Sequence, residues 1–385
     1  MKVLHISSSS KIDGGAEFCL IELINEELMR GIQPFVIVPR AGELENYLRQ
    51  NNILCFVVNS HPWRHNPKQN KVHSIVAYTI KQALNYFAEK KVASIIKQNN
   101  IDLIHINTTA TCLGHLAAKR TSKPLVWHIR EFNDPKLKIT FYSDKSARKI
   151  IGKSSAVIAV SNCVKNAFNS YISPEKLYVI YDKISFSPKK RVAQILESNY
   201  IKICLIANIA PQKGQIDALK ALSILPDNLK KTTRLRIVGK IVNKNYFHTL
   251  REFTKENNLE SIVSFEGFTT DVCGVLNDSD IALNCSWSES FGRTTVEAML
   301  SGCLVIGSNN PCTHELLSNN RGFLYDDPEE LTSLIIGTNS DKNKARFIAL
   351  NGQKFAQNSF NDGPARIINL FKTVKNKPNK KITFL

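Results

Sequence analysis

The chain has 385 residues, of which 43% are hydrophobic and 22% are charged, and this composition excludes a disordered or low-complexity protein. The length is about two to three times that of a typical domain, so we expect two domains. The formal net charge is +18, which indicates a partner such as nucleic acid, an anionic membrane or a phosphorylated ligand without choosing among them.

The positive charge is concentrated in the first half of the chain. Residues 1–200 hold 28 Lys and Arg against 15 Asp and Glu, a net +13, and residues 201–385 hold 23 against 18, a net +5. The surplus of the second half lies in the tail after Phe371, which has no acid and contains Lys372, Lys375, Lys377, Lys380 and Lys381.

Nine cysteines are scattered along the chain, several of them within apolar runs, and no two form a C-x-x-C pair. This pattern favours buried thiols in a reducing compartment over a disulfide framework or a zinc site. The amino terminus becomes polar after a few residues, and no stretch approaches the roughly 18 apolar residues of a spanning helix. We therefore expect a soluble cytoplasmic protein.

Short apolar, β-branched runs alternate with helical patterns along most of the chain, as in parallel sheets covered by helices. The predicted strands of the first half cover residues 2–7, 33–38, 53–58, 101–106, 124–128, 155–160 and 177–181, and a helix is predicted over 16–30. The second half predicts strands 201–207, 234–239, 262–266, 280–285 and 303–307, helices 214–225, 245–257, 271–277 and 293–301, and further helices over 341–375.

These elements predict an α/β fold with two Rossmann-like domains. We place the first domain at residues 1–182, a polar and basic linker at 183–199, the second domain at 200–360, and a carboxy-terminal helix with the basic tail at 361–385. Ligands of open α/β sheets bind beyond the carboxyl ends of the strands, so we expect substrates between the domains, at the loops that follow the strands.

Two of these loops lead into a helix through glycine. Gly14 and Gly15 precede helix 16–30, where free N–H groups and the helix dipole favour a phosphate, although a plain turn with an N-cap is the alternative. Lys213 stands beside Gly214 at a helix start and can neutralise a diphosphate, or it is a solvated surface lysine. Neither loop is a G-x-G-x-x-G or Walker motif.

The most specific segment covers residues 287–307, with a strand end, a glycine loop and a helix start. Glu289 lies in the loop and Glu297 in the first turns of the helix, so both carboxylates can serve one site and bind hydroxyls of a sugar and a ribose. The N–H groups of Gly292 to Thr294 suit the phosphates between them. The alternative is structural: Glu289 caps the helix and Glu297 forms a surface ion pair.

The run Glu-Ser-Phe-Gly-Arg-Thr-Thr-Val-Glu-Ala-Met that begins at Glu289 resembles the Glu-x7-Glu signature of the retaining, GT-B-fold glycosyltransferases of family four, also called group 1. The resemblance covers nearly the whole chain and implies the GT-B fold, in which two Rossmann-like domains face each other across a cleft. Further matches follow in the expected order at residues 14–17, 102–107, 126–128, 160–161, 213–214, 237–239 and 265–268.

The resemblance also implies a role for each matching residue. Glu289 would contact hydroxyls of the donor sugar, Glu297 the ribose, and Lys213 the diphosphate. His128, at the end of a first-domain strand, looks like the family's histidine beside the reacting sugar, with a core histidine as the alternative. We therefore expect His128, Glu289 and Lys213 to be catalytic, and the donor to be bound by Gly14, Gly15, Asn208, Gly239, Gly267, Phe291, Gly292, Arg293, Thr294, Glu297 and Glu315.

Two positions depart from the family pattern. Asn208 stands where members usually have an arginine, so one diphosphate cation is missing, and Arg293 lies on the neighbouring loop. Pro311-Cys312 replaces the usual Gly-Gly pair before Glu315, which we place in a loop that the proline stiffens. These departures leave the identity of the donor open.

The implied reaction moves a sugar from a nucleotide-diphosphate sugar, most simply a UDP-sugar, to a saccharide acceptor with retained anomeric configuration. The family is thought to react on the front face of the sugar, where the leaving phosphate oxygen accepts the acceptor's proton. The protein then supplies positioning and positive charge. We expect no side-chain nucleophile, no cofactor and no metal ion.

Residues 136–153 suit an anionic membrane surface, with a solvated helix face as the alternative. In the GT-B fold the first domain usually holds the acceptor and the last helix crosses back to it. We expect a polyprenyl-diphosphate-linked acceptor of capsule, O-antigen or lipopolysaccharide synthesis on the inner membrane face. The basic residues of the stretch are Lys136, Lys138, Lys145, Arg148, Lys149 and Lys153.

Three other functions stay open at this point. A GT-B-fold nucleotide-sugar epimerase would need no acceptor, and a catalytically inactive scaffold would need neither substrate. A nucleic-acid-binding protein would bind any duplex with strong salt dependence. The last is disfavoured because the sequence has no recognised nucleic-acid motif and no aromatic platforms on its basic face.

Overall fold

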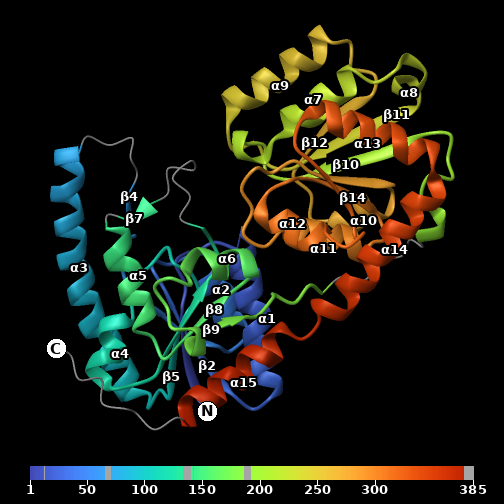
Figure 1. The fold of residues 1–385 in the computed structure, drawn as a ribbon. Helices are drawn as coiled ribbons and strands as arrows, with labels where there is room; N and C mark the ends of the chain where they lie inside the picture. The colour runs from blue at the N-terminus through green and yellow to red at the C-terminus, as the bar shows by residue number, and fades with distance from the viewer. Residues whose placement is uncertain (13, 66–70, 133–139, 142, 186–191, 377–385) are drawn as a thin grey trace. The chain divides into compact units, whose positions relative to one another are not determined.

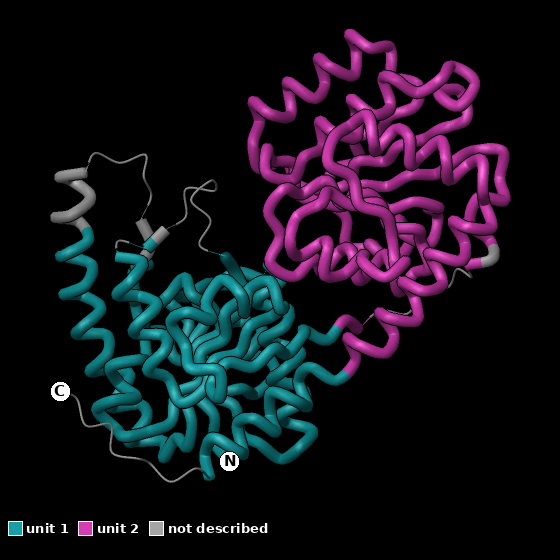
Figure 2. The backbone as a smooth tube through the Cα atoms, viewed as in Figure 1, with its two compact units in different colours: residues 1–183, 362–385 teal, residues 184–361 magenta. Residues whose placement is uncertain are grey.

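The computed structural model describes residues 1–12, 14–65, 71–132, 140–141, 143–185 and 192–376. They form two compact units (Figure 2). The first unit contains residues 1–183 and the segment that begins at Asp362, and the second contains Ile184–Asn361. Each unit has its own parallel sheet covered by helices (Figure 1).

The first unit is built on a seven-stranded parallel sheet with the order β3, β2, β1, β5, β6, β8, β9. Most of its strands are buried on both faces, which explains their continuous apolar runs. The strands are β1 (Lys2–Ile6), β2 (Gln33–Val38), β3 (Leu54–Val57), β5 (Leu103–Ile106), β6 (Leu125–Ile129), β8 (Ala156–Ala159) and β9 (Leu177–Val179). A separate antiparallel pair, β4 (Arg64–His65) and β7 (Thr140–Phe141), was not predicted.

Seven helices of the described residues belong to the first unit, and all but the last lie between its strands in sequence. They are α1 (Gly15–Met29), α2 (Glu43–Gln50), α3 (Lys71–Gln98), α4 (His115–Thr121), α5 (Asp144–Gly152), α6 (Asn162–Phe168) and the last helix of the chain, α15 (Gly363–Asn376). A short 3-10 helix at Pro174–Lys176 precedes β9.

The second unit has a six-stranded parallel sheet with the order β12, β11, β10, β13, β14, β15. Its strands are β10 (Ile201–Ile206), β11 (Thr233–Val238), β12 (Val263–Gly267), β13 (Ile281–Asn284), β14 (Leu304–Ser308) and β15 (Phe323–Tyr325). The first five were predicted within about two residues of their bounds. The sixth was not, because three residues carry too little periodicity to be recognised.

The helices of the second unit are α7 (Gln215–Ser223), α8 (Asp227–Thr232), α9 (Lys244–Glu256), α10 (Val272–Asn277), α11 (Arg293–Leu300), α12 (Pro311–Leu317), α13 (Pro328–Ser340) and α14 (Lys342–Ser359). Short 3-10 helices lie at Val192–Gln194 and Pro211–Lys213. The helices predicted over residues 341–375 are confirmed as α14 and α15.

The predicted linker at residues 183–199 falls mostly in the second unit, which begins at Ile184. Val192, Ile195 and Leu196 lie within the predicted linker, yet they are buried in the core of the second unit. Apolar side chains inside a mostly polar segment account for this packing. The last helix α15 belongs to the first unit, where Ile368 and Phe371 join the core of β1, β5 and β6.

The nine cysteines all lie in the described residues and none forms a disulfide; eight are buried and Cys273 is half-buried. Burial among apolar side chains is what the sequence predicted for them. Within the described ranges, no helix is long and apolar enough to cross a membrane.

Three histidines lie together in the core of the first unit. His5 on β1, His105 on β5 and His128 on β6 are fully buried. His5 shares a 3.0 Å hydrogen bond with His105 through their Nδ1 atoms, and its Nε2 lies 2.8 Å from Glu27 Oε2 of α1. Phe371 of α15 packs 5.3 Å from the His105 ring.

A buried ion pair lies next to this cluster. The Arg130 guanidinium donates to both carboxylate oxygens of Asp182 at 2.7 and 2.6 Å, to Asn107 Oδ1 at 3.0 Å, and lies 3.4 Å from His128 Nδ1. Burial lowers the pKa of His105 and of His128 well below the ordinary value, and the nearby positive charge of Arg130 lowers both further. Both rings are therefore neutral in the folded protein.

We expect the first unit to lose stability in mild acid. The unfolded chain binds protons at His105 and His128 below about pH 6.5 whereas the folded chain does not, so the free energy of unfolding falls as the pH drops, by about 1.4 kcal/mol per pH unit for each ring. Thermal unfolding measured across this range should show a smaller pH slope in His128→Gln. The control is His248→Gln, which changes an exposed ring in the second unit. An unchanged slope in His128→Gln would contradict this account.

Candidate functional site

The strand order of the second unit brings two loops together. β10 lies between β11 and β13, so the chain leaves the middle of the sheet in one direction after β10 and returns on the other side at β13. Such a point, where neighbouring strands send their connections to opposite faces, leaves an open crevice at their carboxyl ends. The loop of residues 207–214 follows β10 and the loop of residues 285–292 follows β13.

The first loop ends in a tight turn that places Lys213. Pro211 starts the 3-10 turn, where its missing N–H is not needed, and Lys213 N donates to Ala210 O at 2.9 Å. Gly214 then begins α7 with φ of 64°. A Cβ on Gly214 would lie 2.0 Å from the Cys285 carbonyl oxygen, so glycine lets the two loops approach within van der Waals contact.

Two ion pairs lie at the ends of these loops. Lys213 Nζ donates to Glu289 Oε2 at 2.9 Å, with the two side chains 27% and 20% exposed. Arg293 Nε donates to Glu297 Oε1 at 2.9 Å within the first turns of α11. The structure thus brings together Lys213 and Glu289, two of the three residues that the sequence predicted to be catalytic.

The same contacts decide between the alternatives for the two acids. The N-cap of α11 is Gly292, with φ of 79°, so Glu289 does not cap the helix and instead binds Lys213. Glu297 pairs with Arg293, but its side chain is only 11% exposed, so the pair is not the surface pair of the structural alternative. Arg293 is therefore held against α11 instead of extending across the neighbouring loop.

Trp287 connects the two loops by hydrogen bonds. We did not predict it as a site residue from the sequence. Its backbone N–H donates to Gln212 O at 3.3 Å, and its indole Nε1 donates to Pro211 O at 3.2 Å. The ring is 38% exposed beside the Lys213 turn. The sequence offered one signal for this role, a tryptophan between the end of a predicted strand and Glu289.

Two buried asparagines fix the loop of residues 285–292 by hydrogen bonds. Asn284, the last residue of β13, donates to Thr295 Oγ1 at 2.8 Å and accepts from Ser286 N at 3.2 Å. Asn310 donates to Ser286 O at 2.7 Å and caps α12 by accepting from the next helix amides. The asparagine before Pro311 is a typical helix-start pattern that could have identified α12 from the sequence.

The helix α12 corrects one prediction. We placed Glu315 in a loop, but it lies on α12, because Asn310 provides the N-cap and Pro311 occupies the first helical position. The missing N–H of this proline is not required there. The replacement of Gly-Gly by Pro311-Cys312 therefore starts a helix rather than stiffening a loop.

The other predicted donor residues of the second unit fall into two groups. Gly239 follows β11 and Gly267 ends β12, and Gly239 N donates to Gly267 O at 2.7 Å. Asn208 is exposed and its carbonyl accepts from Gln215 Nε2 at 3.0 Å. By contrast, the Phe291 ring is buried 5.7 Å from the Phe360 ring. Phe291 therefore packs in the core, and its backbone is the part that lies in the loop.

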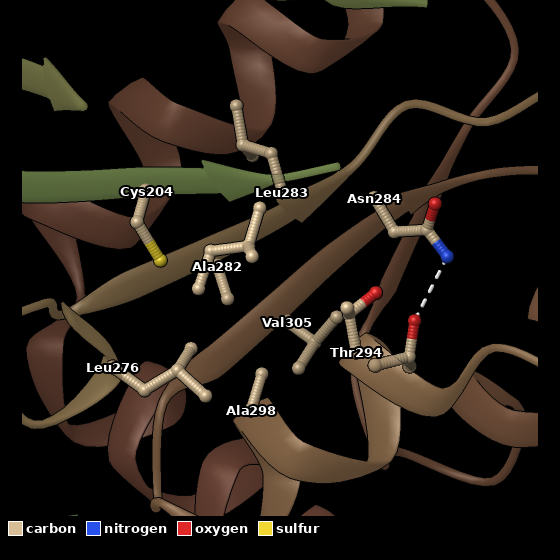
Figure 3. Close-up of a pocket in the computed structure, with 10 residues that line it drawn as sticks. Cys204, Leu276, Ala282, Leu283, Asn284, Thr294, Ala298 and Val305 are labelled. Atoms are coloured by element: carbon tan, nitrogen blue, oxygen red, sulfur yellow. Dashed lines mark hydrogen bonds between the residues drawn. The ribbon is translucent and has the colours of Figure 1, made fainter. Parts of the chain in front are cut away.

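A small apolar cavity lies beneath the start of α11, lined by Cys204, Leu276, Ala282 and Ala298 and edged by Thr294 (Figure 3). The Asn284 amide reaches across one end of it to Thr295 (Figure 3). Its volume is about 10 Å³, which is close to the limit for a single water molecule. This cavity is a gap in core packing and cannot hold a nucleotide or a sugar.

The Cys285 thiol is not a ready nucleophile at this site. Burial raises the pKa of Cys285, directly beneath the Gly214 turn, to about 12. The thiol stays protonated at neutral pH and is a poor nucleophile. Among the described residues no group of three His, Cys, Asp or Glu side chains could hold a metal ion.

The remaining predicted residues belong to the first unit. Gly14 is the N-cap of α1 and Gly15 its first residue, and neither has a positive φ. His128 is fully buried, and its Nε2 has no hydrogen-bond partner among the described residues. We predicted that this ring lines an open cleft beside the sugar, but β6 directs it into the core with His105, as the alternative reading had it.

Comparison with known proteins agrees with this architecture. Residues 13–184 match the family model for glycosyltransferase family 4, and residues 186–355 match the model for glycosyl transferases group 1. MJ1069, an uncharacterized glycosyltransferase of Methanocaldococcus jannaschii, is 25% identical over 279 residues, which cover 65% of this chain and 68% of that protein.

Two solved structures resemble the whole chain. HepE of Anabaena, in complex with UDP, has a TM-score of 0.79 at 24% identity, and the match covers 97% of this chain and 100% of that one. A glycosyltransferase of Rickettsia africae has a TM-score of 0.79 at 23% identity, covering 98% and 99%. At these identities the two structures establish the fold.

We expect the contact between the two loops to require glycine at position 214. In Gly214→Ala the new methyl group would meet the Cys285 carbonyl and the residue would keep a left-handed φ, so the free energy of unfolding of the second unit should fall by about 1 to 3 kcal/mol or more. The matched control is Gly337→Ala in α13, where nothing lies within 4 Å of the added atom and helix propensity favours alanine. Equal stability of the two variants in thermal unfolding would contradict the packing described.

Proposed function

The chain belongs to the group 1 glycosyltransferases of the GT-B fold, and from this premise we propose that it transfers a sugar from a UDP-sugar to a saccharide acceptor with retention of anomeric configuration. The observation that carries the proposal is the Lys213 and Glu289 pair, at the carboxyl ends of β10 and β13. This pair suits a sugar diphosphate, because the lysine can bind the phosphates and the glutamate can bind the sugar hydroxyls.

In this proposal the donor replaces an internal ion pair. Without donor, Lys213 is neutralised by Glu289 at 2.9 Å. A bound diphosphate offers Lys213 more negative charge than one carboxylate, so the lysine turns to the phosphates and Glu289 accepts hydrogen bonds from hydroxyls of the sugar. The pair keeps both groups in place beforehand, which limits reorganisation during the reaction.

The second pair serves the nucleoside side of the donor. The Glu297 side chain is 11% exposed and pairs with Arg293. In this proposal its carboxylate accepts hydrogen bonds from the ribose hydroxyls, and Arg293 stays near. The amide groups at the start of α11, after Gly292, add N–H donors for the phosphates. Asn208 contributes no charge, so Lys213 is the main diphosphate cation in this proposal.

The chemistry then needs no covalent intermediate. The bond between the anomeric carbon and the phosphate oxygen breaks, the acceptor oxygen bonds to that carbon on the same face, and its proton passes to the departing phosphate oxygen. The protein positions the two substrates and stabilises the charge that develops on the phosphate. We propose that Lys213 and the amides of α11 supply this stabilisation without a metal ion.

The donor assignment has support from a relative of known structure. HepE, with the same fold, has been solved with UDP and with UDP-glucose. We propose that the acceptor is lipid-linked through a polyprenyl diphosphate, and that the reaction belongs to the synthesis of capsule, O-antigen or lipopolysaccharide at the cytoplasmic face of the inner membrane. The positive charge of the first half of the chain supports an anionic, diphosphate-bearing acceptor.

Mutation of the central pair tests the proposed site. Lys213→Ala and Glu289→Ala should each lower sugar transfer at least about 100-fold, because each removes a group that acts on the transition state. Both should stay folded, since a half-exposed pair contributes only about 1 kcal/mol. Lys202→Ala is the matched control, because it breaks an exposed pair with Asp278 in the same unit. Full activity in either site variant would exclude this site.

Donor screening tests the choice of nucleotide. UDP and UDP-sugars should raise the melting temperature of the protein, and GDP- or ADP-sugars should do so less, because only a ligand of the folded state stabilises it. The shift should persist in EDTA, since no metal ion is part of the proposal. Stabilisation by GDP-sugars alone would overturn the UDP assignment, and conversion of the nucleotide sugar without any acceptor would indicate an epimerase.

A further inference from the structure

The helix α3 carries a row of exposed apolar side chains in the first unit. Ile80, Leu84 and Phe87 are 57%, 48% and 63% exposed. Their spacing of four and then three residues places them on one side of a helix. Large apolar side chains that form a continuous exposed row mark an interaction surface more often than scattered ones do.

The opposite side of α3 is buried and contains the only acid of the helix. Asn85 and Glu89 are 4% and 1% exposed, and Glu89 accepts from the amides of Gly114 and Ala117 at 2.8 Å each, at the start of α4. The helix has five lysines against this one glutamate. The fold therefore turns the negative charge inward and leaves an exposed face that is apolar and positive.

A basic hollow adjoins the apolar row. It has a volume of about 450 Å³. Arg120 of α4 lies 4.6 Å from the centre of the Tyr86 ring and Lys90 lies 5.3 Å from it, so the aromatic ring holds two cations at the edge of the hollow. The lining residues are Tyr86, Lys90, Ala93, Ser94, Lys97 and Arg120.

The stretch predicted from the sequence to bind a membrane is less suited to that role. Phe141 and Ile151 are buried at 5% and 0% exposure, and Arg148 pairs with Asp144 and packs on the Phe168 ring at 4.5 Å. Lys145 and Lys149 on α5 are exposed, which matches the solvated helix face. Lys136 and Lys138 lie outside the described residues.

We propose that the α3 face, defined as Ile80, Leu84 and Phe87 with the adjoining basic hollow, docks the first unit on an anionic phospholipid bilayer. The apolar row enters the boundary between headgroups and acyl chains, as in an interfacial amphipathic helix. Lys90, Lys97 and Arg120 bind the lipid phosphates, and Tyr86 lies at headgroup depth beside them. The inference deepens the proposed function, because it rests on a lipid-linked acceptor and names the surface that brings the enzyme to it.

Charge and shape together favour a bilayer as the occupant. Positive charge alone would suit any polyanion, but a nucleic acid offers no apolar phase for Ile80, Leu84 and Phe87. The apolar row alone would suit a second copy of the chain, but two α3 faces brought together would oppose their own lysines. An anionic bilayer satisfies both halves of the face.

Vesicle binding of the full chain tests the proposal. The wild-type protein should sediment with vesicles of phosphatidylglycerol and phosphatidylcholine and not with phosphatidylcholine alone. Leu84→Gln/Phe87→Ser and, separately, Lys90→Gln/Lys97→Gln should each weaken that binding about tenfold. The matched controls are Phe347→Ser on α14, where Phe347 is 58% exposed, and Lys255→Gln at the exposed end of α9, and both should bind as the wild type does.

Four results would overturn the proposal. They are equal binding to neutral vesicles, wild-type binding by both α3 variants, release of the bound protein by inorganic phosphate, and a wild-type dimer that becomes a monomer in Leu84→Gln/Phe87→Ser, which would make the face an interface between copies. Inorganic phosphate added at constant ionic strength should not release the protein from the vesicles. Release would show that the basic hollow binds free phosphate instead. Stabilisation of the second unit by UDP should be the same in all variants. A failure of membrane docking is thereby separated from a failure of the proposed donor site.

Discussion

The ion pair between Lys213 and Glu289 is the contact on which the candidate site depends. It joins two side chains 76 positions apart, and the loops that carry them also meet through Trp287 and through the absence of a side chain at Gly214. Both side chains are partly exposed, so the pair adds little stability, but each residue restricts the position of the other. In the proposed reaction the donor therefore meets both groups already in place and replaces the contact that each makes with the other.

The strand order of the second sheet makes this contact available. β10 and β13 are neighbours although β11 and β12 lie between them in sequence, and their carboxyl ends deliver both loops to the same edge. Asn284 and Asn310 then fix the second loop from inside the core. Because buried amides must be satisfied, these bonds restrict the loop more firmly than surface contacts could.

The first unit uses its polar residues differently. Three of its histidines lie inside the core with Arg130 and Asp182, and Phe371 of the last helix packs against the His105 ring. Burial of this group ties the stability of the unit to proton concentration. The positive charge of the chain is left on the surface, where α3 places lysines next to apolar side chains after turning Glu89 inward.

The sequence by itself determined the α/β class, the two sheets, nearly every strand and the family, because continuous apolar runs and the Glu289 to Glu297 signature are local patterns. It could not determine β15 or the two-residue strands, which are too short to show periodicity. Only the tertiary structure decided that His128 is buried, that Lys213 meets Glu289, and that α3 exposes an apolar row. Each of these depends on which segments become neighbours, and that follows from strand order and from the packing of residues far apart in the chain.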